Sequence, residues 1–226
     1  MITLPERTRL PQEQVVYEPH KRGNSAFFDH LELSPKDRQE LRRQIGKLSI
    51  THLIDTKTTN IPRGQLVEQL VVIRVSLLST QLDKDLLKQL DMRLKFYPLF
   101  VLAYPDGREE LLIHYKEALS REVDGRYFRI ERTFTSQEEL EVRFEGRSLD
   151  EVYACLVKDI GQEQLVAKKS QNLKEVIEKS NQLAKLEKQA SSLDKKMRQE
   201  KSTKKAMELR KAYKNLLLQI KEIKGE

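Results

Sequence analysis

The sequence has one cysteine, Cys155, and no tryptophan among its 226 residues. A single cysteine excludes an internal disulfide, as is usual for proteins of the cytosol. No apolar run approaches the roughly 20 residues that a membrane-spanning helix needs. The first residues, MITLPERTRLPQEQ, also lack the apolar core of a signal peptide. We therefore expect a soluble cytoplasmic protein.

The motifs of several enzyme classes are absent as well. Neither GxxxxGK nor GxGxxG occurs, so the sequence does not favour ATP hydrolysis or dinucleotide binding, and we expect no cofactor. The four histidines, His20, His30, His52 and His114, are scattered and form no HExxH motif, so we expect no metal site. Cys155 occupies an apolar-periodic position and is interpreted as a small core residue. These absences favour a protein without enzymatic activity.

Glycine and proline are missing between Gly161 and Gly225, and helix is the default for such a stretch. Residues 163–226 contain 17 Lys and Arg against 9 Asp and Glu. Subtracting these from the totals of 42 and 35 leaves 25 against 26 for residues 1–162. The net charge of +7 therefore belongs to the tail.

The tail has coiled-coil periodicity in two blocks. Val176, Leu183, Ala190 and Met197 are seven residues apart, and a second block starts at Ala206. Because the heptad breaks between the blocks, we predict an antiparallel helical hairpin that turns near residues 200–203. One long helix that dimerises with another chain is the alternative.

The stretch Thr51–Leu78 organises the remainder, with two β-rich runs around a turn at residues 60–64. Its second run, Leu66–Leu78, is apolar on both faces and is predicted to be a central strand. We also expect extended or irregular backbone over 1–25, helices at 35–47 and 82–90, strands at 98–104, 110–116 and 127–134, and short helices after Ser136 and Ser148. The predicted fold class is α+β: a mixed β-sheet domain with flanking helices over residues 1–161, followed by an antiparallel helical hairpin (coiled coil) over 162–226.

Three charged residues around the turn raise the possibility of a nuclease. Metal-dependent DNA cleavage needs carboxylates on adjacent strands, usually with a lysine, and Asp55, Lys57 and Glu68 flank the turn. The Glu-x-Lys signature expected on the second strand is missing, because Gln69 and Leu70 follow Glu68. Solvated charges at strand ends are therefore the favoured interpretation.

Two basic clusters are candidates for nucleic-acid binding. In the first, tyrosines would stack on bases while cations hold phosphates; its members are Tyr115, Lys116, Arg126, Tyr127 and Arg129. The alternative for this cluster is ordinary cross-strand pairing with Glu117 and Glu131. The second cluster lies at the predicted hairpin tip and would bind phosphates in a salt-dependent manner; its members are Lys195, Lys196, Arg198, Lys201, Lys204 and Lys205. Its alternative is the lysine-rich outer surface of a coiled coil.

Short matches in order along the chain carry a family resemblance. They are Leu4-Pro5, Thr59-Asn60-Ile61 with Gly64 after it, Leu99–Leu102, Tyr115-Lys116, Tyr127, Leu149-Asp150 and Val152-Tyr153. Over about residues 4–160 the chain thereby resembles the bacterial family of unknown function numbered 4391. Members of that family look like companions of DNA methyltransferases, helicase-like ATPases and restriction-type proteins in gene clusters for defence against phage. The chain departs from the family pattern at Gln69, Val71 and Arg74, where acidic residues are expected.

The leading hypothesis combines this resemblance with the charge distribution. It is a non-enzymatic accessory subunit of an anti-phage defence or restriction-modification assembly. Its sheet domain would dock on a helicase-like ATPase, a DNA methyltransferase or a restriction-type protein, and its basic hairpin would contact DNA or a second partner. The alternatives are a metal-dependent nuclease and a module that forms a homodimer through its coiled coil.

Overall fold

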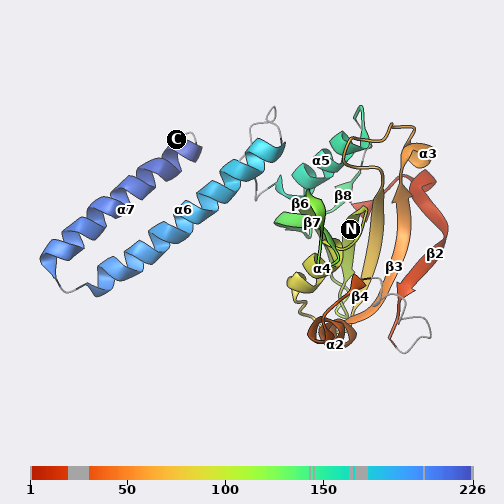
Figure 1. The fold of residues 1–226 in the computed structure, drawn as a ribbon, viewed down its shortest axis with the longest axis horizontal. Coiled ribbons are helices and arrows are strands. Elements are labelled where there is room, and N and C mark those ends of the chain that lie inside the picture. The colour runs from red at the N-terminus through yellow and green to blue at the C-terminus, as the bar shows by residue number, and fades with distance from the viewer. Residues whose placement is uncertain are drawn as a thin grey trace. The chain divides into compact units, whose positions relative to one another are not determined.

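A computed structural model describes residues 2–19, 31–142, 144, 146–162, 165, 173–200 and 202–224. The chain divides into two compact units, Met1–Gly161 and Gln162–Glu226, and each is described by itself (Figure 1). None of the helices in these described ranges has both the length and the apolar character needed to cross a membrane.

The first unit is built on a six-stranded sheet. Its strands, in spatial order, are β2 (Arg9–Tyr17), β3 (Ile45–Ile54), β4 (Leu70–Leu77), β5 (Tyr97–Ala103), β6 (Glu109–Val123) and β7 (Arg126–Ser136). Strands β4 and β5 are parallel and joined through α4 (Lys84–Asp91), whereas the other neighbours are antiparallel. This confirms the predicted mixed sheet. Two short strands, β1 (Ile2–Thr3) and β8 (Leu140–Glu141), form a separate parallel pair, and η1 (Glu6–Thr8) precedes β2.

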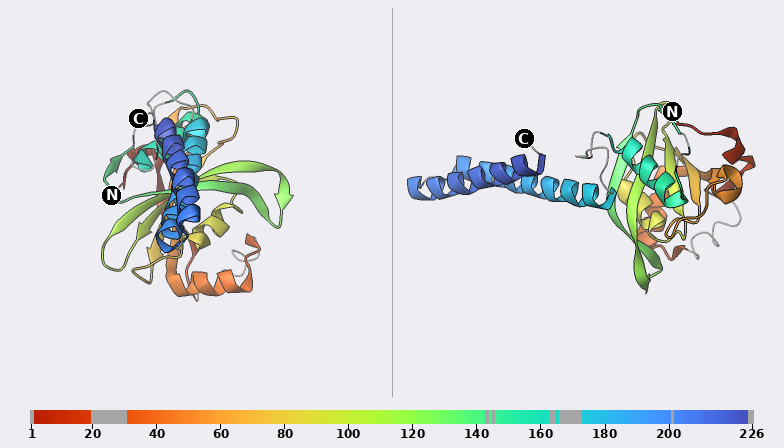
Figure 2. Two further views of the ribbon diagram at one scale, coloured as in Figure 1. Left: turned by 90° about the vertical axis from the view of Figure 1, so that its left-hand side faces the viewer. Right: turned by 90° about the horizontal axis from the view of Figure 1, so that it is seen from above.

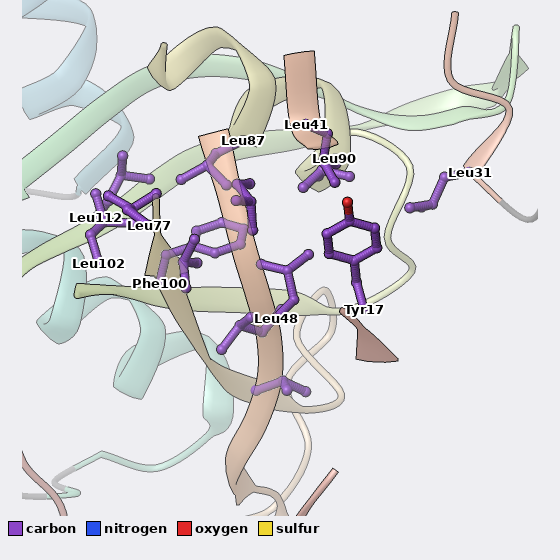
Figure 3. Packing of buried hydrophobic residues seen from close by; sticks show 14 of the residues in the cluster. Tyr17, Leu31, Leu41, Leu48, Leu77, Leu87, Leu90, Phe100, Leu102 and Leu112 are labelled. Atoms are coloured by element: carbon purple, nitrogen blue, oxygen red, sulfur yellow. The ribbon is translucent and has the colours of Figure 1, made fainter. Parts of the chain in front are cut away.

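Strand β4 has the central place that its apolar pattern predicts. It lies between β3 and β5, and both of its faces are largely buried. Val71, Ile73 and Val75 face the helices α2 (Pro35–Gln44) and α4, together with Phe100 and other members of one core (Figure 3). That core stabilises the sheet because each fully buried aliphatic or aromatic side chain contributes about 1.5–3 kcal/mol.

Helix α5 (Leu149–Ile160) covers the other face of the sheet. Its Tyr153 ring packs edge-on against Tyr97, with the ring centroids 4.8 Å apart. Tyr97 and Phe100 are three residues apart on β5, so their side chains point to opposite faces. The first unit is therefore a sheet between α2 and α4 on one side and α5 on the other.

Residues 9–17 form β2, so this part of the stretch predicted to be extended or irregular is extended; as an edge strand, β2 can accommodate Pro11. Three local predictions are wrong. The helix expected to reach residue 47 ends at Gln44, because Ile45 is already the first residue of β3 and pairs with Leu77 of β4. Ser136 ends β7 and does not cap a helix. Cys155 is exposed on α5 rather than in the core. In the first two cases, pairing between strands overrides a local signal.

The second unit is the predicted antiparallel hairpin. Helix α6 (Leu173–Gln199) and helix α7 (Thr203–Lys224) pack side by side (Figures 1 and 2). Their shared apolar core consists of Leu183, Leu186, Ala190, Tyr213, Leu216, Ile220 and Ile223. An ion pair of 2.9 Å between Lys224 and Glu187 also joins the two helices. The seam predicted from the heptads is thus formed within one chain.

Candidate functional site

The first carboxylate of the nuclease hypothesis, Asp55, is a helix cap. Its Oδ1 accepts hydrogen bonds of 2.9 Å from the backbone N–H groups of Lys57 and Thr58, at the start of α3 (Thr56–Thr59). The Thr58 hydroxyl in turn accepts a bond from the Asp55 backbone N–H. This reciprocal capping box satisfies donors that the helix leaves unpaired. Asp55 therefore has a local structural role.

The other two members of that hypothesis do not complete a metal site. Glu68 is 75% exposed and lies 3.8 Å from Arg63, and Lys57 is exposed at the surface. In the part of the chain that the structure describes, no group of three or more His, Cys, Asp or Glu residues is arranged to hold a metal ion. The geometry thus gives the nuclease hypothesis no support.

The turn that follows α3 binds a carboxylate of its own chain. Asp150, at the start of α5, accepts hydrogen bonds from the backbone N–H groups of Gln65 (2.7 Å), Leu66 (3.2 Å) and Val67 (2.8 Å). Gly64 lies against the same carboxylate. Three converging N–H groups form an anion-binding concavity, which here fixes α5 to the turn between α3 and β4.

Lys116 belongs to a buried charge cluster. Its Nζ donates to Asp91 Oδ1 (2.5 Å) and to the Phe96 carbonyl (2.7 Å), and it lies over the rings of Phe128 and Tyr97 at 4.0 and 4.7 Å. Only 1% of its side chain is exposed. Burial lowers the Lys116 pKa, and Asp91 opposes that shift. The interpretation of Lys116 as a surface phosphate ligand is therefore wrong, because its ammonium group is enclosed.

His114 is the third member of this cluster. Its Nδ1 lies 2.7 Å from Asp91 Oδ2, and its Nε2 is buried without a hydrogen-bond partner among the described residues. The Tyr153 hydroxyl donates to the His114 carbonyl (2.6 Å) and accepts from the Lys116 N–H (3.3 Å), which ties α5 to β6. The sequence contains one sign of this network: Asp91 ends α4, where the helix dipole disfavours a negative charge.

Arg129 and Tyr127, from the same predicted surface, are engaged by neighbours. Arg129 forms ion pairs with Glu131 and with Glu117, the latter at 3.4 Å across the β6–β7 hairpin. The Tyr127 ring lies 4.6 Å from Lys95 Nζ. Arg129 thus shows the cross-strand pairing that the sequence analysis gave as the alternative to phosphate binding.

Tyr115 and Arg126 complete that group. Tyr115 is half-buried opposite Arg132, and Arg126 lies near the end of the hairpin, opposite Val123. The Arg126 Nε atom is buried and has no hydrogen-bond partner within the described ranges. The five residues are therefore spread between a buried cluster, an ion-paired strand and a hairpin end, and they do not make one cationic surface.

A polar cavity of about 580 Å³, which the sequence analysis missed, lies on the sheet face that carries Val101. Its polar lining includes Arg9, Glu13, Thr51, His52, Arg74 and Glu109. Arg74 pairs with Glu109 at 2.6 Å, and Glu13 pairs with Lys47 at 3.2 Å. Burial lowers the pKa of His52, which favours its neutral form. Because carboxylates and cations alternate here, the lining selects no class of charged ligand.

The hairpin tip keeps the cations that the sequence places there. Lys195, Lys196 and Arg198 at the end of α6 are exposed, as are Lys204 and Lys205 at the start of α7. Arg198 pairs with Asp194 at 2.9 Å. Lys195, Lys196, Lys204 and Lys205 form no ion pair with any residue that the structure describes. Lys201, the sixth predicted residue, lies outside the described residues.

The fold defines an α+β protein with an appended helical hairpin. The chain belongs to the family described as Domain of unknown function (DUF4391), which matches residues 2–220. This match extends beyond the resemblance over residues 4–160 and includes α6 and most of α7. No curated protein and no solved structure matches the chain.

Proposed function

We propose that this protein is a non-enzymatic accessory subunit of a bacterial anti-phage defence or restriction-modification assembly, and that its hairpin tip contacts nucleic acid. The chain belongs to the DUF4391 family. Members of this family look like companions of DNA methyltransferases, helicase-like ATPases and restriction-type proteins, and this likeness supports a role in a defence assembly. The sheet domain would dock on such a partner in the cytoplasm.

The observation that carries the nucleic-acid proposal is the charge of the hairpin tip. Residues 195–205 contain six Lys and Arg and a single acid, Glu200. The lysines of this segment that are described are exposed at the adjoining ends of two helices, so one phosphate backbone can meet several of them. Each phosphate that a cation neutralises releases counterions, which strengthens binding at low salt.

A comparison of two charge-matched variants tests this proposal. The tip variant replaces Lys195, Lys196, Lys204 and Lys205 by Gln, and the control variant replaces four exposed lysines elsewhere on α6, Lys174, Lys179, Lys185 and Lys188. Both variants lose the same net charge. Anisotropy of labelled single-stranded and duplex oligonucleotides, measured with the full chain at several salt concentrations, gives the affinity and its salt slope.

The tip variant should lose most of the affinity, and its log–log salt slope should flatten by up to about 3.6, at about 0.9 for each phosphate contact. The control variant should keep the wild-type slope. Equal losses in both variants would mean that net charge alone binds, and absence of binding by the wild-type chain would remove nucleic acid from the proposal. Copurification of the tagged full chain with the products of neighbouring genes tests the accessory role separately.

A further inference from the structure

Helix α7 has a second apolar set that does not face α6. The exposed fractions of Met207, Leu217 and Leu218 are 69%, 39% and 60%. Tyr213 and Leu216, by contrast, pack in the seam between the two helices. Large apolar side chains grouped on one exposed helix face are typical of an interaction site.

These apolar residues are interleaved with cations. Positions on a helix that are alternately four and three residues apart lie along one side of it, and this spacing joins Met207, Lys211, Lys214, Leu218 and Lys221. We call these five residues the α7 stripe. All five are exposed and none is acidic; Arg210 and Leu217 flank them on one side and Glu222 on the other. The stripe is therefore both apolar and strongly positive.

The combination of charges and apolar groups points to a protein ligand. A phosphate backbone is held by cations, and it would leave Met207 and Leu218 in water. An interfacial membrane helix buries a broad apolar face, whereas Tyr213, Leu216, Ile220 and Ile223 of α7 pack against α6. A partner that covers the stripe needs apolar side chains of its own, with carboxylates beside them.

A second copy of this chain does not meet that requirement. In a symmetric dimer the same patch faces itself, so Lys211, Lys214 and Lys221 of both chains would be brought into one interface. Like charges brought together at an interface oppose association. Charge complementarity therefore selects a different, acidic partner.

We propose that the α7 stripe docks an acidic amphipathic helix of a partner protein. Leucine-type side chains of the partner pack on Met207 and Leu218, and its glutamates or aspartates pair with Lys211, Lys214 and Lys221. This is recognition of an amphipathic helix through its apolar face, with the two apolar anchors of the stripe 11 residues apart on α7. It does not depend on nucleic-acid binding at the hairpin tip, which uses other lysines.

Two designed helical peptides serve as probes for the full chain. The acidic probe has leucines along one face bordered by glutamates, and the basic probe has the same leucines bordered by lysines. Fluorescence anisotropy should show binding of the acidic probe only. Anionic phosphatidylglycerol vesicles and a short DNA duplex are measured under the same conditions.

Substitutions in the stripe then separate packing from charge. Met207→Gln/Leu218→Gln should weaken binding of the acidic probe about tenfold or more, because central apolar anchors carry most interface energy. Leu66→Gln removes a leucine that is 66% exposed in the first unit and should change nothing. Lys211→Glu/Lys214→Glu should abolish binding of the acidic probe and create binding of the basic probe. Circular dichroism checks that each variant stays helical.

Several results would overturn the proposal. These are equal binding of the two probes, wild-type affinity in Met207→Gln/Leu218→Gln, failure of the charge reversal to exchange the probes, or binding to vesicles or duplex that depends on Met207 and Leu218. The tip variant with Gln at 195, 196, 204 and 205 should keep its affinity for the acidic probe. Failure of nucleic-acid binding at the tip can thereby be told apart from failure of docking at the stripe.

Discussion

Gly64 and Asp150 lie so close that a Cβ atom on Gly64 would be 2.1 Å from Asp150 Oδ1. The same carboxylate accepts the N–H groups of residues 65–67, so it has no room to withdraw without losing hydrogen bonds. Gly64→Ala should therefore lower the free energy of unfolding by about 1–3 kcal/mol, as overpacking does. Urea denaturation followed by circular dichroism measures the loss.

A double-mutant cycle tests the cause of that loss. Asp150→Ala alone should destabilise by about 1.5–3 kcal/mol, because it removes hydrogen bonds to a charged acceptor. In Gly64→Ala/Asp150→Ala the added methyl group no longer meets the carboxylate. The double variant should therefore lose less unfolding free energy than the sum of the two single losses. Strict additivity would show that Gly64 is needed for another reason.

The ion pair of Lys116 with Asp91 predicts a large effect from removing one partner. Lys116→Met leaves the buried Asp91 carboxylate without its cation and should cost about 3–5 kcal/mol of unfolding free energy. Asp91→Asn/Lys116→Met should recover part of this loss, because no uncompensated charge remains. The exposed pair of Lys47 with Glu13 is the control, and Lys47→Met should cost at most about 1 kcal/mol. Similar losses at both lysines would contradict the argument.

These two contacts mark where the sequence stops being sufficient. The central strand, the helix that begins after Ser34 and the two-helix tail follow from local patterns: alternation, a cap and a heptad. Asp91 and Lys116 are 25 residues apart, and Gly64 and Asp150 are 86 residues apart. No local pattern links such pairs, because they are brought together by the packing of elements that are distant in the sequence: α4 with β6, and the turn after α3 with α5.

The same limit applies to the candidate sites. The sequence identifies the charges of Lys116 and Arg129 but not their carboxylate partners, so it groups buried and paired cations into one surface. The hairpin-tip lysines are different because two short segments on either side of one turn supply them. Their exposure follows from the heptad, which places them away from the apolar seam.

Substitutions at Asp55 distinguish a helix-capping role of this residue from a catalytic one. Asp55→Ala should cost about 0.5–2 kcal/mol of stability, whereas Asp55→Asn should cost less because asparagine also caps helices. Plasmid incubated with Mg²⁺ and the purified chain should stay intact in both variants and in wild type. Mg²⁺-dependent cleavage that a folded Asp55→Ala variant lacks would instead favour the nuclease hypothesis.

Buried tyrosines predict a loss of stability at alkaline pH. Burial raises the pKa of Tyr97 and of Tyr104 from 10.0 to about 12, and it raises the pKa of Tyr153 well above 10.0. Between these values the unfolded chain binds fewer protons than the folded chain, so stability falls as pH rises.

Each of these tyrosines should contribute a slope of up to about 1.4 kcal/mol per pH unit in that range. Urea denaturation at a series of pH values measures the slope, and tyrosinate absorbance counts the tyrosines that ionise late. Tyr104→Phe should remove one late-ionising group and reduce the slope. Ionisation of all seven tyrosines near pH 10 would contradict the prediction.

The seam of the hairpin predicts that α6 and α7 stabilise each other. Isolated helices are only marginally stable in water, so truncating a seam residue should destabilise both helices together. Leu183→Ala or Ile220→Ala should each cost about 2–5 kcal/mol and should remove hydrogen-exchange protection across residues 173–224. Leu217→Ala, at a residue that is 39% exposed, should leave protection unchanged. A dimer seen by light scattering in wild type and lost in Leu183→Ala would instead place this seam between two chains.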